Sequence, residues 1–208
     1  MIKIIAPKSG RKNFIEVVNQ NNSLIFIIIC YIIGILAGVL FFKYNNESGV
    51  YYYKEFNEIY SEFKSGFGSN FISSFFRQLP YAAAVFLAGS SMIGAVISPA
   101  IIALRGAAYG IIMSYTCCNF GLMGIVFNLL ILIPPAVISA IAIILSARES
   151  FGFSLSLARL ALPNCTAPKV SEDFKLFCLR QLFVFLFFLV SALLEGFMAT
   201  SFIGFFNL

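Results

Sequence analysis

Two charged residues lie inside long apolar stretches of the sequence. Arg105 interrupts "PAIIALRGAAYGIIM", and Glu195 interrupts "LVSALLEGFMATSF". A charge at such a position is costly inside a membrane, so it normally pairs with another charge or lines a wet cavity. Both residues are therefore candidate intramembrane polar sites. The chemistry open to them is an ion pair or, for Glu195, protonation by desolvation.

Arg105 has two interpretations. It lies six residues beyond Pro99, about 9 Å into a helix at 1.5 Å per residue, from which its long side chain can snorkel to the headgroups. Alternatively, it faces the helix bundle and pairs with Glu195, which lies about 21 Å along its own helix. The difference in depth favours a snorkelling Arg105 and an independent Glu195 that is protonated or contacts water.

Most other catalytic chemistry is excluded. The sequence has no histidine, which removes Ser-His-Asp and Cys-His nucleophile pairs and imidazole metal sites. The five cysteines form no CxxC pair and are expected to act as small apolar residues, with the adjacent Cys117 and Cys118 the pair worth testing for redox behaviour. We expect no enzyme activity and no cofactor. The positive residues form no stripe with stacking aromatics, so nucleic acid is not an expected partner.

The composition indicates a polytopic membrane protein. Hydrophobic residues make up 60% of the 208 residues, only 11% are charged, and the mean hydropathy is +0.93. Soluble domains average about 45–50% apolar and about 25% charged residues. A helix of about 20 apolar residues crosses the hydrocarbon core. The predicted fold is all-α, a single membrane domain with five transmembrane helices at residues 24–43, 80–98, 99–118, 122–146 and 181–205.

Prolines mark two of these predicted helices. Pro99 suits the first turn of the third helix, where a missing N–H leaves no hydrogen bond unmade. Pro134 and Pro135 should kink the fourth helix, because each proline removes a backbone donor and clashes with the preceding turn.

The distribution of lysine and arginine predicts the orientation in a cell membrane. Residues 1–23 carry four of them and residues 147–180 carry five, whereas residues 44–79 carry three. Because positive residues accumulate on the cytoplasmic side, the N-terminus and the 147–180 loop are expected inside, and residues 44–79 and the C-terminus outside. In the inner loop, the apolar stretch 151–162 is too short to span and is expected at the interface or re-entering the bundle.

Four glycines have the spacing of helix contacts. Gly34 and Gly38 lie four residues apart on the first helix, and Gly106 and Gly110 are spaced likewise on the third. Small residues at this spacing let membrane helices approach closely. The contact can lie within one chain, which we favour, or between two copies in a homo-oligomer.

The outer segment contains the best amphipathic pattern in the chain, "YYYKEFNEIYSEFKSGF". Its aromatic and aliphatic residues fall on one helical face, whereas Glu55, Glu58 and Glu62 fall on the other. Such a helix rests on the membrane interface, where lipid favours aromatic side chains. Its acidic face could also dock an extracytoplasmic protein, and the two roles are compatible.

This arrangement resembles the stage II sporulation protein M family of bacterial integral membrane proteins, which have about this length and five spans. The resemblance covers nearly the whole chain in layout and is most specific over residues 86–146. In that region the glycine-punctuated stretch "FLAGSSMIGAVISPAIIALRGAAYGIIMSY" is similar to a helix pair of the family. Arg105-Gly106 stands where family members commonly have asparagine-glycine.

The following stretch, "FNLLILIPPAVISAIAIILSA", matches the family in part. One proline of the Pro134-Pro135 pair and Ala136 agree with the family's proline-alanine. Asn128 stands for a histidine and Leu132 for a glutamate, and both are departures. The resemblance makes Asn128 a third candidate intramembrane polar residue.

What the resemblance implies is a scaffold. Family members act in engulfment during endospore formation, with the cell-wall hydrolases named stage II sporulation proteins D and P as extracytoplasmic partners. The alternative is a small permease or channel subunit, in which Arg105, Glu195 and the proline kink line a path. The chain shows no inverted repeat and has one well-buried acid, so a scaffold is favoured.

Overall fold

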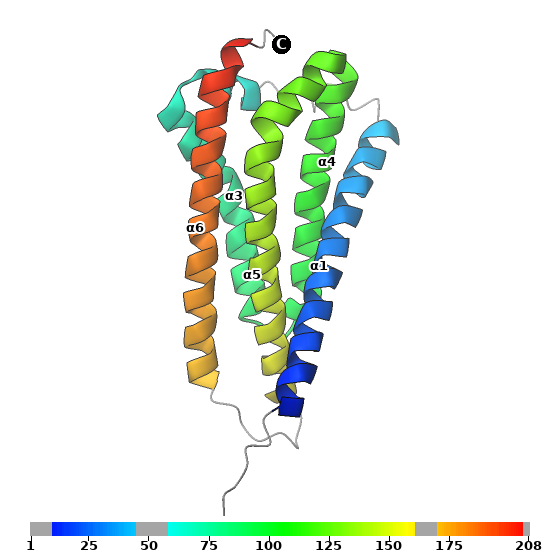
Figure 1. Ribbon diagram of the computed structural model, residues 1–208, viewed down its shortest axis with the longest axis vertical. Coiled ribbons are helices and arrows are strands. Elements are labelled where there is room, and N and C mark those ends of the chain that lie inside the picture. The colour runs from blue at the N-terminus through cyan, green and yellow to red at the C-terminus, as the bar shows by residue number, and fades with distance from the viewer. Residues whose placement is uncertain (1–9, 45–57, 161–169, 206–208) are drawn as a thin grey trace, which may run out of the picture.

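The computed structural model describes residues 10–44, 58–160 and 170–205, and within these ranges the chain is helical and contains no strand (Figure 1). Residues 58–64 form a short helical segment, called here the outer segment. The longer elements are α1 (Gly10–Tyr44), α3 (Phe67–Gly89), α4 (Gly94–Phe127), the π-helix η2 (Asn128–Leu132), α5 (Ile133–Leu160), α6 (Val170–Phe202) and the 3₁₀-turn η3 (Ile203–Phe205).

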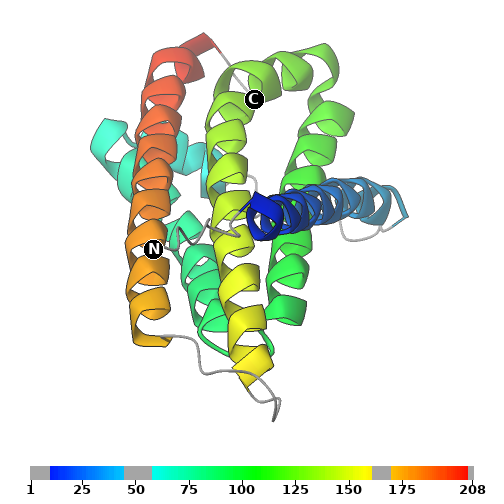
Figure 2. The same cartoon turned by 60° about the horizontal axis from the view of Figure 1, so that its bottom comes forward.

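The long helices lie roughly side by side in an elongated bundle. The first turn of α1 and the last turn of α6 lie at opposite ends (Figure 1). α1 packs mainly on α4 and to a lesser extent on α5, and the tilted view shows it crossing in front of both (Figure 2). The chain reverses at Gly121, whose φ of 55° and ψ of −128° suit only glycine. α5 therefore runs back beside the first part of α4.

Four helical stretches are long and apolar enough to cross a membrane: Asn22–Tyr44, Phe67–Gly89, Gly94–Ala158 and Asp173–Phe205. The all-helical membrane class is confirmed. The third stretch has 65 residues, about 98 Å of helix, or about three times the thickness of a bilayer core. It contains the Gly121 reversal. Five spans follow if this stretch crosses twice, which stays a prediction.

The second and third helices do not have their predicted bounds. α3 begins at Phe67 rather than residue 80, and the break to α4 falls at residues 90–93 rather than at 98/99. Ser90 and Ser91 end α3 by donating hydroxyl hydrogen bonds to Leu87 O and Ala88 O. Because this turn is short and the residues on both sides of it are apolar, hydropathy did not reveal it, and the predicted break fell at Pro99 instead. Pro99 consequently lies inside α4 and does not open it.

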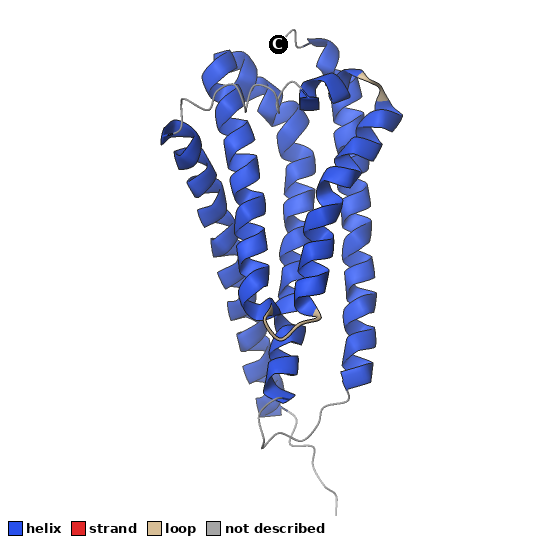
Figure 3. Cartoon of the chain, turned by 180° about the vertical axis from the view of Figure 1, so that it is seen from behind, coloured by secondary structure: helices blue, strands red, loops and turns tan. Residues whose placement is uncertain are grey.

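The predicted 147–180 loop is also mostly helical. α5 continues to Leu160 and α6 begins at Val170. The apolar stretch at 151–162 therefore continues α5 through residue 160 and does not form a separate interfacial element. As Figure 3 shows from behind, the α3–α4 turn, drawn in tan, stops short of the ends of α5 and α6.

Buried serines on one face of α5 hold the neighbouring helices. The Ser150 hydroxyl donates to Val85 O (2.9 Å) and the Ser154 hydroxyl donates to Met92 O (3.0 Å). Ser154 Oγ also accepts a hydrogen bond from the Ala95 N–H (2.9 Å). Small polar side chains of this kind join membrane helices where no water competes. They fix the turn between α3 and α4 against α5.

The four singled-out glycines lie at the contact between α1 and α4. A Cβ added at Gly34 or Gly38 would overlap the backbone of α4, and one added at Gly106 or Gly110 would overlap the backbone of α1. The backbones thus approach as closely as the small residues permit. This face is occupied within the chain, which leaves it unavailable to a second copy.

The fourth predicted helix bends through a π-turn. The N–H of Ile133 reaches Asn128 O, five residues back, immediately before Pro134 and Pro135. The two prolines offer no N–H to the carbonyls four residues earlier, which favours the wider turn. The Pro135 carbonyl accepts a hydrogen bond from the Ser191 hydroxyl at 2.8 Å, which ties the bend to α6.

Candidate functional site

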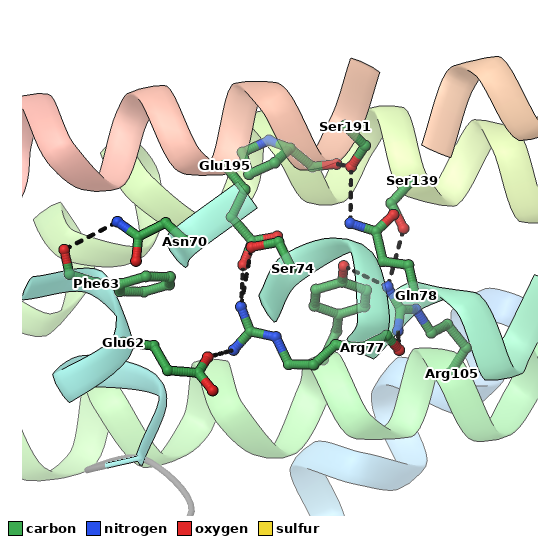
Figure 4. A network of polar contacts seen from close by, with 12 residues as sticks. Glu62, Phe63, Asn70, Ser74, Arg77, Gln78, Arg105, Ser139, Ser191 and Glu195 are labelled. Atoms are coloured by element: carbon green, nitrogen blue, oxygen red, sulfur yellow. Dashed lines mark hydrogen bonds and ion pairs between the residues drawn. The ribbon is translucent and has the colours of Figure 1, made fainter. Parts of the chain in front are cut away.

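A cluster of charged side chains lies between α3, α6 and the outer segment, with Arg77 at its centre (Figure 4). Arg77 Nη2 is 2.6 Å from Glu195 Oε1 of α6. Its Nη1 lies 3.4 Å from Glu62 Oε2 of the outer segment. Nη2 also donates to Ser74 Oγ, one turn earlier on α3, at 3.2 Å. One guanidinium therefore joins three parts of the chain.

The cluster lies deep in the bundle. Arg77 is fourteen residues from Ser91 at the α3–α4 turn, about 21 Å, and Glu195 is fifteen residues from Arg180, about 22 Å. Measured from that end, these depths lie past the midpoint of a bilayer core of about 30 Å but still inside it. Only 12% of the Glu195 side chain is exposed, against 32% of Arg77. An isolated charge would be very costly there, so each charge stabilises the other.

Glu195 was expected to be independent of a basic partner, and this is wrong. Its partner is Arg77, which was expected in the segment between the first two spans because the second span was predicted to begin thirteen residues later than α3 does. Once α3 begins at Phe67, Arg77 lies three turns inside the helix and reaches α6.

Arg105 does not snorkel, and its contacts do not include Glu195. Its side chain is buried, with 7% of the residue exposed. Nη2 donates to Tyr109 Oη and Ser139 Oγ, both at 3.1 Å, and Nη1 donates to Arg77 O at 3.5 Å. The guanidinium carbon lies 4.6 Å and 4.9 Å from the ring centres of Tyr81 and Tyr109.

The depth of Arg105 in α4 explains why its side chain is buried and does not snorkel. Because α4 begins at Gly94, Arg105 is eleven residues along the helix, about 16 Å rather than about 9 Å. From the middle of the membrane a side chain does not reach the headgroups. Aromatic rings and hydroxyls solvate the guanidinium instead.

Two amides extend the cluster along α3. Asn70 Nδ2 donates to Phe63 O at 3.1 Å, and Gln78 Nε2 donates to Ser191 Oγ at 3.4 Å. Asn70, Ser74, Gln78 and Tyr81 recur at intervals of three or four residues, the spacing of one helical face. This polar stripe is the signal in the sequence that identifies the first half of α3 as a buried helix.

The outer segment packs into the protein rather than onto lipid. Tyr60 and Phe63 are buried, at 7% and 1% exposure, among aromatic side chains of α1 and α4. The Phe63 ring lies 6.3 Å from the Phe127 ring, and the Arg77 guanidinium lies 5.8 Å from Phe63. The prediction that this aromatic face rests on the membrane interface is therefore wrong for residues 58–64.

The three glutamates proposed for docking have different surroundings. Glu62 pairs with Arg77 and keeps 37% of its side chain exposed, so its carboxylate is only partly available on an outward face. Glu58 is exposed. Glu55 lies outside the described residues. Of the two described glutamates, Glu58 is the one whose surroundings suit a contact with a partner best, because Glu62 is engaged by Arg77.

Asn128 has a separate set of contacts at the α4–α5 reversal. Its Oδ1 accepts from Thr116 Oγ1 at 2.8 Å, and its Nδ2 donates to Met113 O at 3.2 Å and to Cys117 Sγ at 3.3 Å. All these partners belong to α4. The side chain therefore closes the hairpin and does not join the charged cluster.

A family model, Stage II sporulation protein M, matches residues 27–200. The chain belongs to this family. The matched stretch contains every member of the charged cluster, from Glu62 to Glu195. No curated protein and no solved structure matches the chain. Family membership and the long apolar helices make this a membrane protein related to sporulation, in a family that is generally non-catalytic.

Proposed function

We propose that the protein is a non-enzymatic membrane scaffold that holds cell-wall hydrolases at the outer face of the membrane during engulfment. By resemblance the partners are stage II sporulation proteins D and P. The observation that supports this most is the attachment of the outer segment to the bundle through Phe63 and through the Glu62–Arg77–Glu195 contacts. In the proposed orientation the N-terminus is cytoplasmic, five spans follow, and the C-terminus is outside.

The attachment suits a scaffold because it fixes the position and orientation of the docking surface relative to the bundle. A partner bound on the exposed side of residues 58–69 would be held at one height and one angle above the membrane. The exposed charges there, Glu58 and Lys64, would guide encounter and register more than they would add affinity. Preorganisation of the surface lowers the entropy cost of binding.

Co-purification of the two hydrolases with the full chain tests this function. Glu58→Lys should lower their recovery several-fold while insertion and thermal stability are retained, because Glu58 faces water. Asp173→Lys is the matched control, since Asp173 is an exposed acid near the start of α6. Equal recovery with both variants and the unaltered chain would exclude docking through this surface.

One observation favours a second function, a small permease or channel subunit. Arg77, Arg105 and Glu195 place charges inside the apolar bundle, and the chain also contains a π-turn at Asn128–Leu132; both features recur along transport paths. Reconstitution into liposomes discriminates between the two functions. A pH or ion gradient that dissipates with the unaltered chain and persists with Glu195→Gln would support transport over the scaffold.

A further inference from the structure

α3 and α6 enclose a groove of about 320 Å³ that is open on one side. Its α3 wall is Leu79, Ala82, Ala83 and Phe86, and its α6 wall includes Leu182 and Phe185. Gln181 also lines the groove, but its Nε2 donates to Ser146 O and Ser150 Oγ and its Oε1 accepts from Ser146 Oγ. The surface offered to a ligand is therefore apolar.

The groove lies in one half of the bilayer. From Ser90 at the end of α3, Phe86 is about 6 Å and Leu79 about 17 Å along the helix. The ion pair of Arg180 with Glu149 lies in the same half of the bundle, and the Arg180 side chain is 57% exposed. In the proposed orientation this is the cytoplasmic end, so the groove spans the depth of the inner-leaflet acyl chains.

Stacked rings adjoin the groove at its lining residue Phe86, and a positive charge lies beyond the groove toward the same end of the bundle. The ring centres of Phe86 and Phe177 lie 5.5 Å apart, and those of Phe177 and Phe153 lie 4.9 Å apart. Lys175 is exposed and lies seven residues before Leu182, on the same side of α6. A lysine at this height meets lipid phosphates.

We propose that this groove is a binding site for an anionic phospholipid of the inner leaflet. One acyl chain lies between α3 and α6, and the phosphate contacts Lys175. An apolar groove with a lysine near one end suits an amphiphile that has a hydrocarbon chain and an anionic head, rather than an apolar partner helix. An extended acyl chain can lie along the groove between the two helices.

Native mass spectrometry of the full chain with added phosphatidylglycerol or phosphatidylcholine tests the site. The unaltered chain should retain phosphatidylglycerol about tenfold better. Ala83→Phe should lower that retention about tenfold by filling the groove, whereas Ala37→Phe on the exposed side of α1 should leave it unchanged. Lys175→Gln should abolish the preference for the anionic lipid. Equal retention of the two lipids, or no effect of Ala83→Phe, overturns the proposal.

Cys178 lies in the groove wall and gives a second readout that does not depend on the Ala83→Phe substitution. With the other cysteines replaced by serine, phosphatidylglycerol should slow maleimide labelling of Cys178 more than phosphatidylcholine does. Unchanged labelling contradicts a lipid in the groove. A photo-crosslinker at position 83 that captures a protein instead of lipid in intact membranes also contradicts it. No hydrolase takes part in these experiments, so their failure is distinct from failure of the scaffold.

Discussion

Arg77 of α3 and Glu195 of α6 form an ion pair of 2.6 Å near the middle of the bundle, and Glu62 joins the same guanidinium from the outer segment. The pair therefore does two things at once. It neutralises charge where lipid surrounds the protein, and it connects the surface proposed for docking to a transmembrane helix. Both consequences can be measured.

Removing one partner of this ion pair should destabilise the protein much more than removing both partners. Arg77→Met or Glu195→Leu should each cost about 2–4 kcal/mol of stability, somewhat below the range for fully buried pairs because 32% of the Arg77 side chain is exposed. The double variant should recover much of that loss. Thermal unfolding in detergent gives the coupling energy, expected above about 1 kcal/mol. A coupling of only a few tenths would mean that the two residues act independently.

Arg105→Lys should lower the stability of the protein. If Arg105 snorkelled to the headgroups, the same substitution would be nearly neutral. The ammonium group cannot reproduce the planar contacts with Tyr81 and Tyr109 together with the hydrogen bond to Ser139. The expected loss is about 1–2 kcal/mol. Arg180→Lys is the control, since that side chain is 57% exposed and its ion pair with Glu149 survives the change. Equal melting temperatures for both variants would refute the buried assignment of Arg105.

The helical class, the reversal near residue 120 and the bend at the prolines could all be predicted from the sequence, because long apolar runs and proline chemistry are local signals. The partner of Glu195 could not be predicted by averaging hydropathy. The first half of α3 contains Asn70, Ser74, Arg77 and Gln78, which lower the average until the run resembles an outer loop. Their spacing along one helical face would have identified a buried polar stripe.

The predicted position of the outer segment on the membrane interface was wrong for a different reason. Its amphipathic pattern is real, but a pattern does not say whether an aromatic face meets lipid or protein. Phe63 meets Phe127 because α4 and η2 bring that ring to the end of the bundle at which residues 58–64 lie. Such a contact joins residues far apart in the chain, and only the assembled helices specify it.

The α1–α4 contact should not tolerate a branched side chain at its glycines. Gly34→Val places new atoms against the backbone of Ala103, so we expect a loss of about 3 kcal/mol or more, or displacement of α1. Ala37→Val, on the exposed side of the same helix, should change stability by less than about 0.5 kcal/mol. Crosslinking of cysteine pairs placed across α1 and α4 reports the displacement. Retained crosslinking with unaltered melting of Gly34→Val would contradict this packing.

Five spans with a cytoplasmic N-terminus make an alternating pattern of accessibility that single cysteines can test. In a version whose native cysteines are serine, an impermeant thiol reagent should label cysteine at Glu58 and at Asn119 in sealed cells, because both positions are exposed at the proposed outer end. Cysteine at Ser90 or Asp173, exposed at the opposite end, should react only after permeabilisation. The comparison of Ser90 with Asn119 decides the number of spans, because the first part of α4 lies between the two positions. If both react from the same side, α4 does not cross the membrane, and the five-span arrangement is wrong.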